Sequence, residues 1–266
     1  MLDRSLRAQW NQTDDSWRFD LPTGWMQGRS TFGGLTAAVS VALARRHLDP
    51  SRRLRSFTVQ LLRPLVPGPV EGRYRIHRAG KHITFADVDL AQGEQPAALT
   101  RMVFADSRDD ARAIAPTASW SGPDPESLVD MPYIAGVTPE FTQNVAFRWV
   151  SGGLPFTGSD QTQLAGYCRF RVPFGDVEGV VALLDAWPSP SLGMLRAPAA
   201  ASTVHWSAHI AALPARFDGW FGFTYETVIA TDGYHTVVGR LYDPDGALIA
   251  STEQLVALFD REGAAQ

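Results

Sequence analysis

The sequence predicts an α+β fold in which a helix followed by a series of antiparallel strands occurs twice. Three observations support this prediction. Small and apolar residues recur at helical spacing within residues 30–49, segments of alternating polarity follow them, and a second helix-and-strand series begins after about residue 140. With 266 residues, 45% of them hydrophobic, the chain can bury one large core or two smaller ones.

The first helix is expected within residues 30–49, STFGGLTAAVSVALARRHLD. Ser30 and Thr31 stand at its start, where a hydroxyl can accept a hydrogen bond from a free backbone N–H group. Arg45 and Arg46 fall in its last turn, where positive charge complements the negative end of the helix dipole. The pattern therefore predicts a helix that is capped at both ends.

Strands are expected after each of two helices. Residues 55–105 contain alternating segments broken by PGP, AGK and AQGEQ, which is typical of antiparallel strands joined by short turns. The second helix is expected at residues 176–187, DVEGVVALLDAW, and the strand ASTVHWSAHI at residues 201–210. Further strands follow, and the Asp232-Gly233 and Asp245-Gly246 dipeptides predict tight hairpin turns between them.

The two halves align as an internal repeat. Equivalent residues lie 145 positions apart near the helices and 153 apart near the turns: Gly34 with Gly179, Thr58 with Thr203, Gly80 with Gly233, and Gly93 with Gly246. An insertion around LPARFDGWF in the second half accounts for the difference. A matched helix, strand and pair of turns in the same order indicate a tandem duplication.

The repeat predicts two units, residues 1–110 and residues 141–266. A linker at residues 111–140, rich in Pro, Ser and Asp, is expected to cross the surface between them. Two antiparallel sheets, each wrapped round its own helix and joined by sheet pairing, form the tandem (double) hotdog arrangement. Because the edges and flat outer faces of such sheets are usually covered, we expect a homodimer or a higher homo-oligomer.

The net charge of −4 argues against a general nucleic-acid-binding protein. The charge is uneven, because residues 1–110 hold 16 basic against 12 acidic side chains and the remainder holds 8 against 16. The basic excess includes SRRLRS at residues 51–56 and RYRIHRAGKH at residues 73–82. Two interpretations stay open for these stretches: a solvated strand edge, or a binding surface for a phosphorylated small molecule.

The expected location is the cytoplasm. No apolar run is long enough for a transmembrane helix, and the charged first residues do not resemble a signal peptide. Cys168 is the single cysteine, so no intrachain disulfide can form, and its strand-like surroundings favour a packed core thiol.

Asp185 raises a specific question, because it stands within the apolar run GVVALLDAW. A buried carboxylate without a partner costs several kcal/mol or shifts its pKa. This side chain must therefore be solvated, paired with another group, or used in chemistry.

Several motifs, taken in order, resemble the acyl-CoA thioesterase II family. They are FGG at the first helix, SFTVQLLRPLVPGPVE after it, and LLDAW, STVHW and ASTEQ in the second half, and the likeness extends from about Trp17 to Phe259. The resemblance implies two fused hotdog units that hydrolyse acyl-CoA thioesters to a free acid and CoA. It also implies a catalytic trio of Asp185, Thr203 and Gln254.

The internal repeat offers a separate test of that trio. Its front-half counterparts in the sequence alignment are Ser40, Thr58 and Arg101, so the first half lacks both the carboxylate and the amide. The chemistry expected of the trio is activation of a water molecule, with Asp185 as general base or as direct nucleophile. The alternative interpretation is that Asp185 is a solvated charge on the helix.

Four further residues are candidates for contacts with the substrate. By analogy with hotdog thioesterases, the backbone at Gly33 and Gly34 would polarise the thioester carbonyl at the positive end of the first helix, although tight packing would also explain both glycines. Phe32 would line the acyl pocket, although core packing is the more common use of such a residue. Arg55 would contact the CoA phosphates.

Two other functions remain open at this stage. One is a non-hydrolytic acyl-thioester binding protein on the same fold, and the other is a hotdog hydratase or dehydratase. The stretch TGSDQT lacks the Asn, Pro and His residues that a hydratase motif would need. We expect no metal ion and no redox cofactor, because neither a glycine-rich nucleotide loop nor a metal-ligand spacing on a helix is present.

Overall fold

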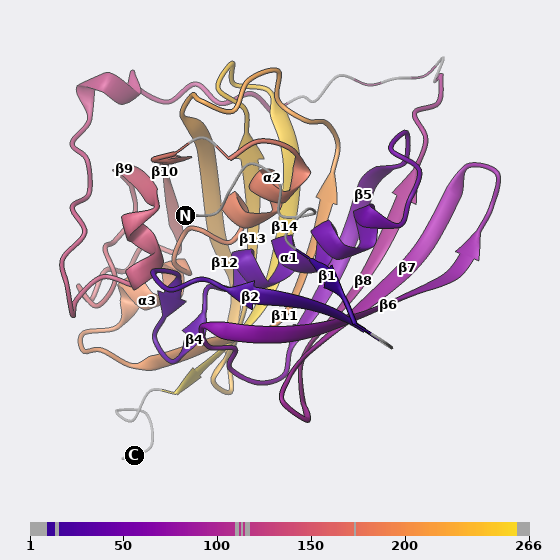
Figure 1. The fold of residues 1–266 in the computed structure, drawn as a ribbon. Coiled ribbons are helices and arrows are strands. Elements are labelled where there is room, and N and C mark those ends of the chain that lie inside the picture. Colours follow the sequence, from indigo (N-terminus) through magenta and orange to yellow (C-terminus); the bar gives the residue numbers. More distant parts are fainter. Residues whose placement is uncertain are drawn as a thin grey trace.

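The computed structural model describes residues 10–13, 16–109, 112, 114, 118–172 and 174–259 (Figure 1). The beginning of the first predicted unit, part of the predicted linker and the last seven residues of the second unit lie outside the described residues. The strands are β1 (Asn11–Gln12), β2 (Trp17–Leu21), β3 (Met26–Gln27), β4 (Ser30–Thr31), β5 (Arg53–Leu61), β6 (Gly68–Ala79), β7 (Ile83–Gln92), β8 (Gln95–Ala105), β9 (Val145–Ser151), β10 (Gln163–Phe170), β11 (Ala200–Ile210), β12 (Phe221–Thr231), β13 (Tyr234–Tyr242) and β14 (Leu248–Phe259). The helices are α1 (Gly33–Arg46), α2 (Val177–Leu183) and α3 (Pro190–Met194), with 3₁₀ turns η2 (Pro125–Ser127) and η3 (Glu140–Gln143).

Twelve of these strands form one continuous antiparallel sheet in the order β1-β2-β6-β7-β8-β5-β11-β14-β13-β12-β10-β9. The two halves of the chain meet where β5 pairs with β11, and the strand order on one side of this seam mirrors the order on the other. The predicted joining of the two units by sheet pairing is therefore confirmed, but the result is one large sheet instead of two. The edges of β5 and β11 satisfy each other's backbone hydrogen bonds, which merges the two half-sheets into one.

The two main helices contact each other within the curve of this sheet (Figure 1). Helix α1 is buried from Gly33 to Ala44, which fits its nearly uninterrupted run of small and apolar residues. Its last turn is tied to the second half of the chain, because the Arg45 guanidinium lies 2.6 Å from Glu178 and 2.9 Å from Asp176. The seam thus brings the helix of each half against the other.

The start of α1 and the end of α2 differ from the sequence-based expectation. The residue before α1 is Phe32, whose side chain makes no capping hydrogen bond. Ser30 and Thr31, the expected capping residues, belong to β4 instead. The Ser30 hydroxyl instead accepts a hydrogen bond from the Leu65 N–H group. Helix α2 ends at Leu183, so Asp185 lies in the turn that follows it and not in the helix.

Strand register corrects the residue-by-residue alignment of the repeat. A β-bulge interrupts β5 between Leu54 and Ser56 and β11 between Thr203 and His205, and the matched bulges fix which positions are equivalent. By this register the front-half position equivalent to Thr203 is Leu54. The position equivalent to Gln254, on β14, is Met102, on β8.

The outer face of the second half is covered by the chain segment that joins the halves. The Tyr167 hydroxyl donates to the Pro123 carbonyl, and the Trp220 indole N–H donates to the Glu126 carboxylate. Aromatic and charged side chains thus hold residues Pro123 and Glu126 of this segment against β10 and the residue before β12.

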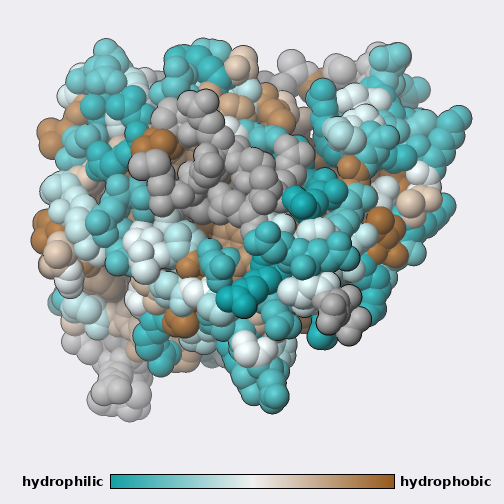
Figure 2. Space-filling model, in the orientation of Figure 1, coloured by the Kyte–Doolittle hydropathy of each residue, from teal (hydrophilic) through white to brown (hydrophobic). Residues whose placement is uncertain are grey.

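None of the helices among the described residues is long and apolar enough to cross a membrane. The face visible in Figure 2 is mainly hydrophilic, with small separate hydrophobic patches. Cys168 is fully buried, in agreement with the expected core thiol.

Candidate functional site

Asp185, Gln254 and Thr203 form a hydrogen-bonded chain on the inner side of the sheet. The Gln254 side-chain amide donates to the Asp185 carboxylate at 2.7 Å, and the Thr203 hydroxyl donates to the Gln254 amide oxygen at 2.8 Å. Thr203 acts through Gln254, because its hydroxyl fixes which end of the amide faces the carboxylate. The structure thus brings together the three residues that the resemblance implied.

The carboxylate also caps helix α1 from the other half of the chain. The backbone N–H group of Gly34 donates a hydrogen bond to Asp185, at a position that the helix's own first residues leave without a side-chain acceptor. A Cβ atom at Gly33 would lie 2.7 Å from Asp185 Oδ2, so only glycine admits the carboxylate this close to the helix. The positive end of the α1 dipole therefore faces the charge.

Burial dominates the ionisation of this carboxylate. Asp185 is 9% exposed, and desolvation raises its pKa from the ordinary value of 3.8 to about 7. The hydrogen bonds from Gln254 and Gly34 act in the opposite direction, because they stabilise the charged form. A carboxylate with a pKa near 7 can accept a proton in neutral solution, as a general base must.

Tyr225 is a further residue of the site that sequence analysis missed. It is 2% exposed on the inner face of β12, where burial raises the pKa of its phenol and the nearby Asp185 charge raises it further. A Cβ atom at Gly239 would lie 2.8 Å from the Tyr225 ring, so this glycine leaves space for the ring. In the sequence, the signal that could have indicated this position was a tyrosine, Tyr225, paired with a glycine, Gly239, on the next strand.

Two predicted substrate contacts have other partners in the structure, although Phe32 directly precedes Gly33 at the start of α1. Phe32 is fully buried and stacks on Phe141 with ring centroids 4.1 Å apart, so core packing accounts for it. Arg55 donates to the Asp106 carbonyl at the end of β8. The β5 residue nearest Gly33 is Leu61, six positions after Arg55. Six residues of a strand span about 20 Å, so Arg55 is distant from the start of α1. The roles of Phe32 and Arg55 in substrate binding stay predictions.

The first half carries no equivalent chemistry. The positions that match Thr203 and Gln254 hold Leu54 and Met102, both buried and apolar. Ser40, the counterpart of Asp185 in the sequence alignment, lies inside α1 and donates its hydroxyl hydrogen bond to the Thr36 carbonyl. Among the described residues, the first half therefore has no counterpart of the hydrogen-bonded Asp185, Gln254 and Thr203 chain at the equivalent positions.

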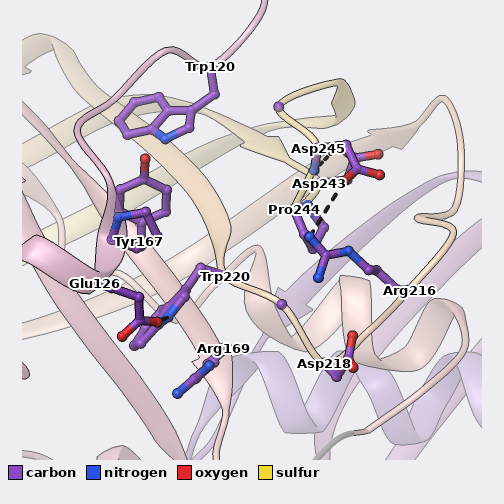
Figure 3. Close-up of a pocket in the computed structure, with 13 residues that line it drawn as sticks. Trp120, Glu126, Tyr167, Arg169, Arg216, Asp218, Trp220, Asp243, Pro244 and Asp245 are labelled. Carbon is purple, nitrogen blue, oxygen red and sulfur yellow. Dashed lines mark hydrogen bonds and ion pairs between the residues drawn. The ribbon is translucent and has the colours of Figure 1, made fainter.

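An open pocket of about 370 Å³ lies elsewhere, on the outer face of the second half (Figure 3). Aromatic side chains of the joining segment, β10 and the β11–β12 insertion form one side, and the β13–β14 turn lies across from them. No residue of the Asp185 cluster lines this pocket. Among the described residues, no group of His, Cys, Asp and Glu side chains is arranged to hold a metal ion.

Comparisons with known proteins show which family the chain resembles. A family model described as the acyl-CoA thioesterase N-terminal domain matches residues 21–105, and one described as the acyl-CoA thioesterase C-terminal domain matches residues 125–258. No curated protein sequence gives a significant match.

Solved structures share the fold at low sequence identity. A protein of unknown function with a hot dog fold from Alicyclobacillus acidocaldarius has a TM-score of 0.85 and 18% identity, covering 94% of this chain and 96% of its own. A protein proposed to be a thioesterase II from Thermobifida fusca has a TM-score of 0.82 and 18% identity, covering 98% and 99%. The acyl-CoA thioesterase II TesB2 from Mycobacterium marinum has a TM-score of 0.75 and 16% identity, covering 97% and 98%.

The close approach of Gly33 to the carboxylate generates a testable prediction. Replacement of Gly33 by alanine should push Asp185 out of its position while the fold is retained, because alanine is a better helix former than glycine. We expect turnover of an acyl-CoA substrate to fall about 10²-fold, the usual cost of a misplacement of about 1 Å at a reacting group. The measurement is kcat by thiol release, with circular dichroism to verify the fold.

Gly175→Ala is the matched control, because no heavy atom lies within 4 Å of a Cβ atom placed at Gly175. It should leave kcat unchanged. A Gly33→Ala protein that turns over at the wild-type rate would contradict the assignment of the α1 terminus to Asp185.

Proposed function

Because the chain belongs to the acyl-CoA thioesterase family, we propose that it hydrolyses acyl-CoA thioesters with a water molecule activated by Asp185. The observation that carries this proposal is the buried Asp185 carboxylate, held between the Gln254 amide and the Gly34 N–H group with its pKa raised to about 7. The proposal requires a binding site for one water molecule beside the carboxylate oxygen Oδ2.

The proposed reaction proceeds in two steps. Asp185 removes a proton from the water as its oxygen attacks the thioester carbonyl carbon, which gives a tetrahedral oxyanion. The carbonyl then re-forms, the C–S bond breaks, and CoA leaves as a thiolate that takes up a proton from Asp185 or from solvent. A thiolate is a weak base and leaves without strong acid assistance, so one carboxyl group suffices.

Gln254 and Thr203 have different proposed roles. One N–H of the Gln254 amide donates to Asp185, and the second N–H is free by stoichiometry to donate to the attacking water or to the oxyanion. Thr203 is a positioning residue, because its hydroxyl bonds to the far end of the amide. The Gly34 N–H is assigned to holding Asp185, which replaces the expectation that it polarises the substrate carbonyl.

We also propose the finer organisation that the sequence suggested. The units at residues 1–110 and 141–266 would fold round α1 and α2, with the catalytic groups contributed by the second unit and their helix terminus by the first. The protein would act in the cytoplasm as a homo-oligomer, with acyl-CoA as its partner and no cofactor.

The direct test of the function is thiol release from acyl-CoA substrates of increasing chain length. We expect purified protein to release CoA from at least one of them, because the family and the Asp185 cluster both point to hydrolysis. Binding without release would instead indicate an acyl-thioester binding protein. A modified acyl group on an intact thioester would indicate a hydratase or dehydratase, and either result would contradict the proposal.

The raised pKa of Asp185 predicts a specific pH dependence. A general base must be deprotonated, so kcat/KM should rise with pH and level off above about 7. Stability should change in the opposite direction. The folded-state pKa is above the unfolded value near 3.8, so the folded protein retains its proton more tightly and loses stability as pH rises from about 4 to about 7.

Asp185→Asn should lack both effects, since asparagine does not titrate. The measurements are the pH–rate profile and unfolding by denaturant at pH 5 and pH 8. The carboxylate would have an ordinary pKa if kcat/KM of the wild-type protein rose with pH near 4 instead of near 7. The same conclusion would follow if the pH dependence of stability in Asp185→Asn were the same as in the wild-type protein.

A further inference from the structure

The outer face of the first half carries two adjacent stripes of opposite charge. Arg73 and Arg75 lie on β6, and Asp87 and Asp89 lie on β7. The strand register places Arg73 opposite Asp89 and Arg75 opposite Asp87. On β7 the residues beside the two aspartates, Ala86, Val88 and Leu90, are buried. On β6 Gly72 is buried, Tyr74 is half-buried and Ile76 is exposed. This alternation places the four charged side chains on the side of the sheet that faces away from α1.

Apolar side chains lie on the same face beside the charges. Leu99 is 37% exposed and pairs with Asp89 across β7 and β8, and Phe85 is 39% exposed on β7. Asp87 already accepts from Arg101 and from His77. Arg73, Arg75 and Asp89 are exposed at the surface. Phe85 and Leu99 thus add apolar surface beside the charged side chains of this face.

In the second half, the corresponding outer face of the sheet is covered by another part of the chain. There the joining segment places the Trp120 ring against Gly222, where a Cβ atom would lie 2.6 Å from it, and Trp120 packs edge-on against Tyr167. Within the part of the chain that the structure describes, no corresponding segment lies over β6, β7 and β8. The two halves share one scaffold and differ in what covers it.

We propose that this face of β6, β7 and β8 binds the same face of a second copy of the chain. The two-fold axis would lie parallel to the strands, between β6 and β7 and midway between the stacked sheets. Such an axis places the partner's β6 over β7 without shifting residues along the strand. Arg73 of each copy then lies above Asp89 of the other, and Arg75 lies above Asp87.

Charge complementarity favours this arrangement over the main alternative, in which the two-fold axis has another direction. A two-fold axis in the same plane but perpendicular to the strands would place β6 over β6 and β7 over β7, with Arg against Arg and Asp against Asp. Face-to-face sheets pack about 10 Å apart, a distance that the long Arg side chains can bridge to the Asp carboxylates. Like charges brought together across an interface are strongly unfavourable.

Charge reversal tests the proposed interface directly. By sedimentation equilibrium the wild-type protein should have at least twice its chain mass of 29.1 kDa. Arg73→Asp and Asp89→Arg should each raise the dissociation constant about tenfold or more, because each reversal creates two like-charge contacts per dimer. The double variant Arg73→Asp/Asp89→Arg should recover the wild-type mass, and so should an equimolar mixture of the two single variants.

Arg240→Asp is the matched control, an exposed arginine on β13 in the second half, and it should leave the mass unchanged. Circular dichroism and thermal unfolding verify that each variant is folded. A wild-type mass of 29.1 kDa at micromolar concentration would overturn the proposal. Single reversals with the wild-type mass, or no recovery in the mixture, would overturn it as well. None of these outcomes bears on thioester hydrolysis.

Discussion

The contact between the Asp185 carboxylate and the N-terminus of α1 is the constraint on which the site depends. Helix α1 has no cap of its own, and it receives one from a turn in the other half of the chain. The carboxylate in turn obtains a backbone N–H donor and a favourable helix dipole in a place without bulk water. Neither half could form this arrangement alone, because the acceptor and the donor come from different halves.

This arrangement balances two opposing effects. Burial penalises the charged carboxylate and raises its pKa, whereas the Gln254 and Gly34 hydrogen bonds stabilise the same charge. The outcome is a carboxyl group poised between protonation states near neutral pH, at a cost in folding stability. Such a cost at a polar group within an apolar core is typical of a functional site. The apolar Leu54 and Met102 at the equivalent positions of the first half carry no such cost.

The sequence contained much of the fold and some of the site. Alternation and helical spacing located the helices and strands, and the Asp232-Gly233 and Asp245-Gly246 turns have the positive φ angles at glycine that the hairpins require. The cap of α1 was not predictable, because its acceptor lies about 150 residues away along the chain. The equivalence of Thr203 with Leu54 was also hidden, because the β-bulges that set the register leave no clear trace in the sequence. Tyr225 and Asp185 lie about 40 residues apart along the chain, so no local sequence pattern connects them.

Single-turnover hydrolysis of an acyl-CoA thioester by Asp185→Asn protein tests the central claim most directly. Asparagine keeps the shape of the side chain, so substrate binding and the fold should survive while the proton acceptor is lost. The account predicts a rate about 10²–10⁴-fold below that of the wild-type protein, the usual contribution of a general base. A folded Asp185→Asn protein that hydrolyses the bound thioester at the wild-type rate would contradict the assignment of Asp185 as the catalytic base.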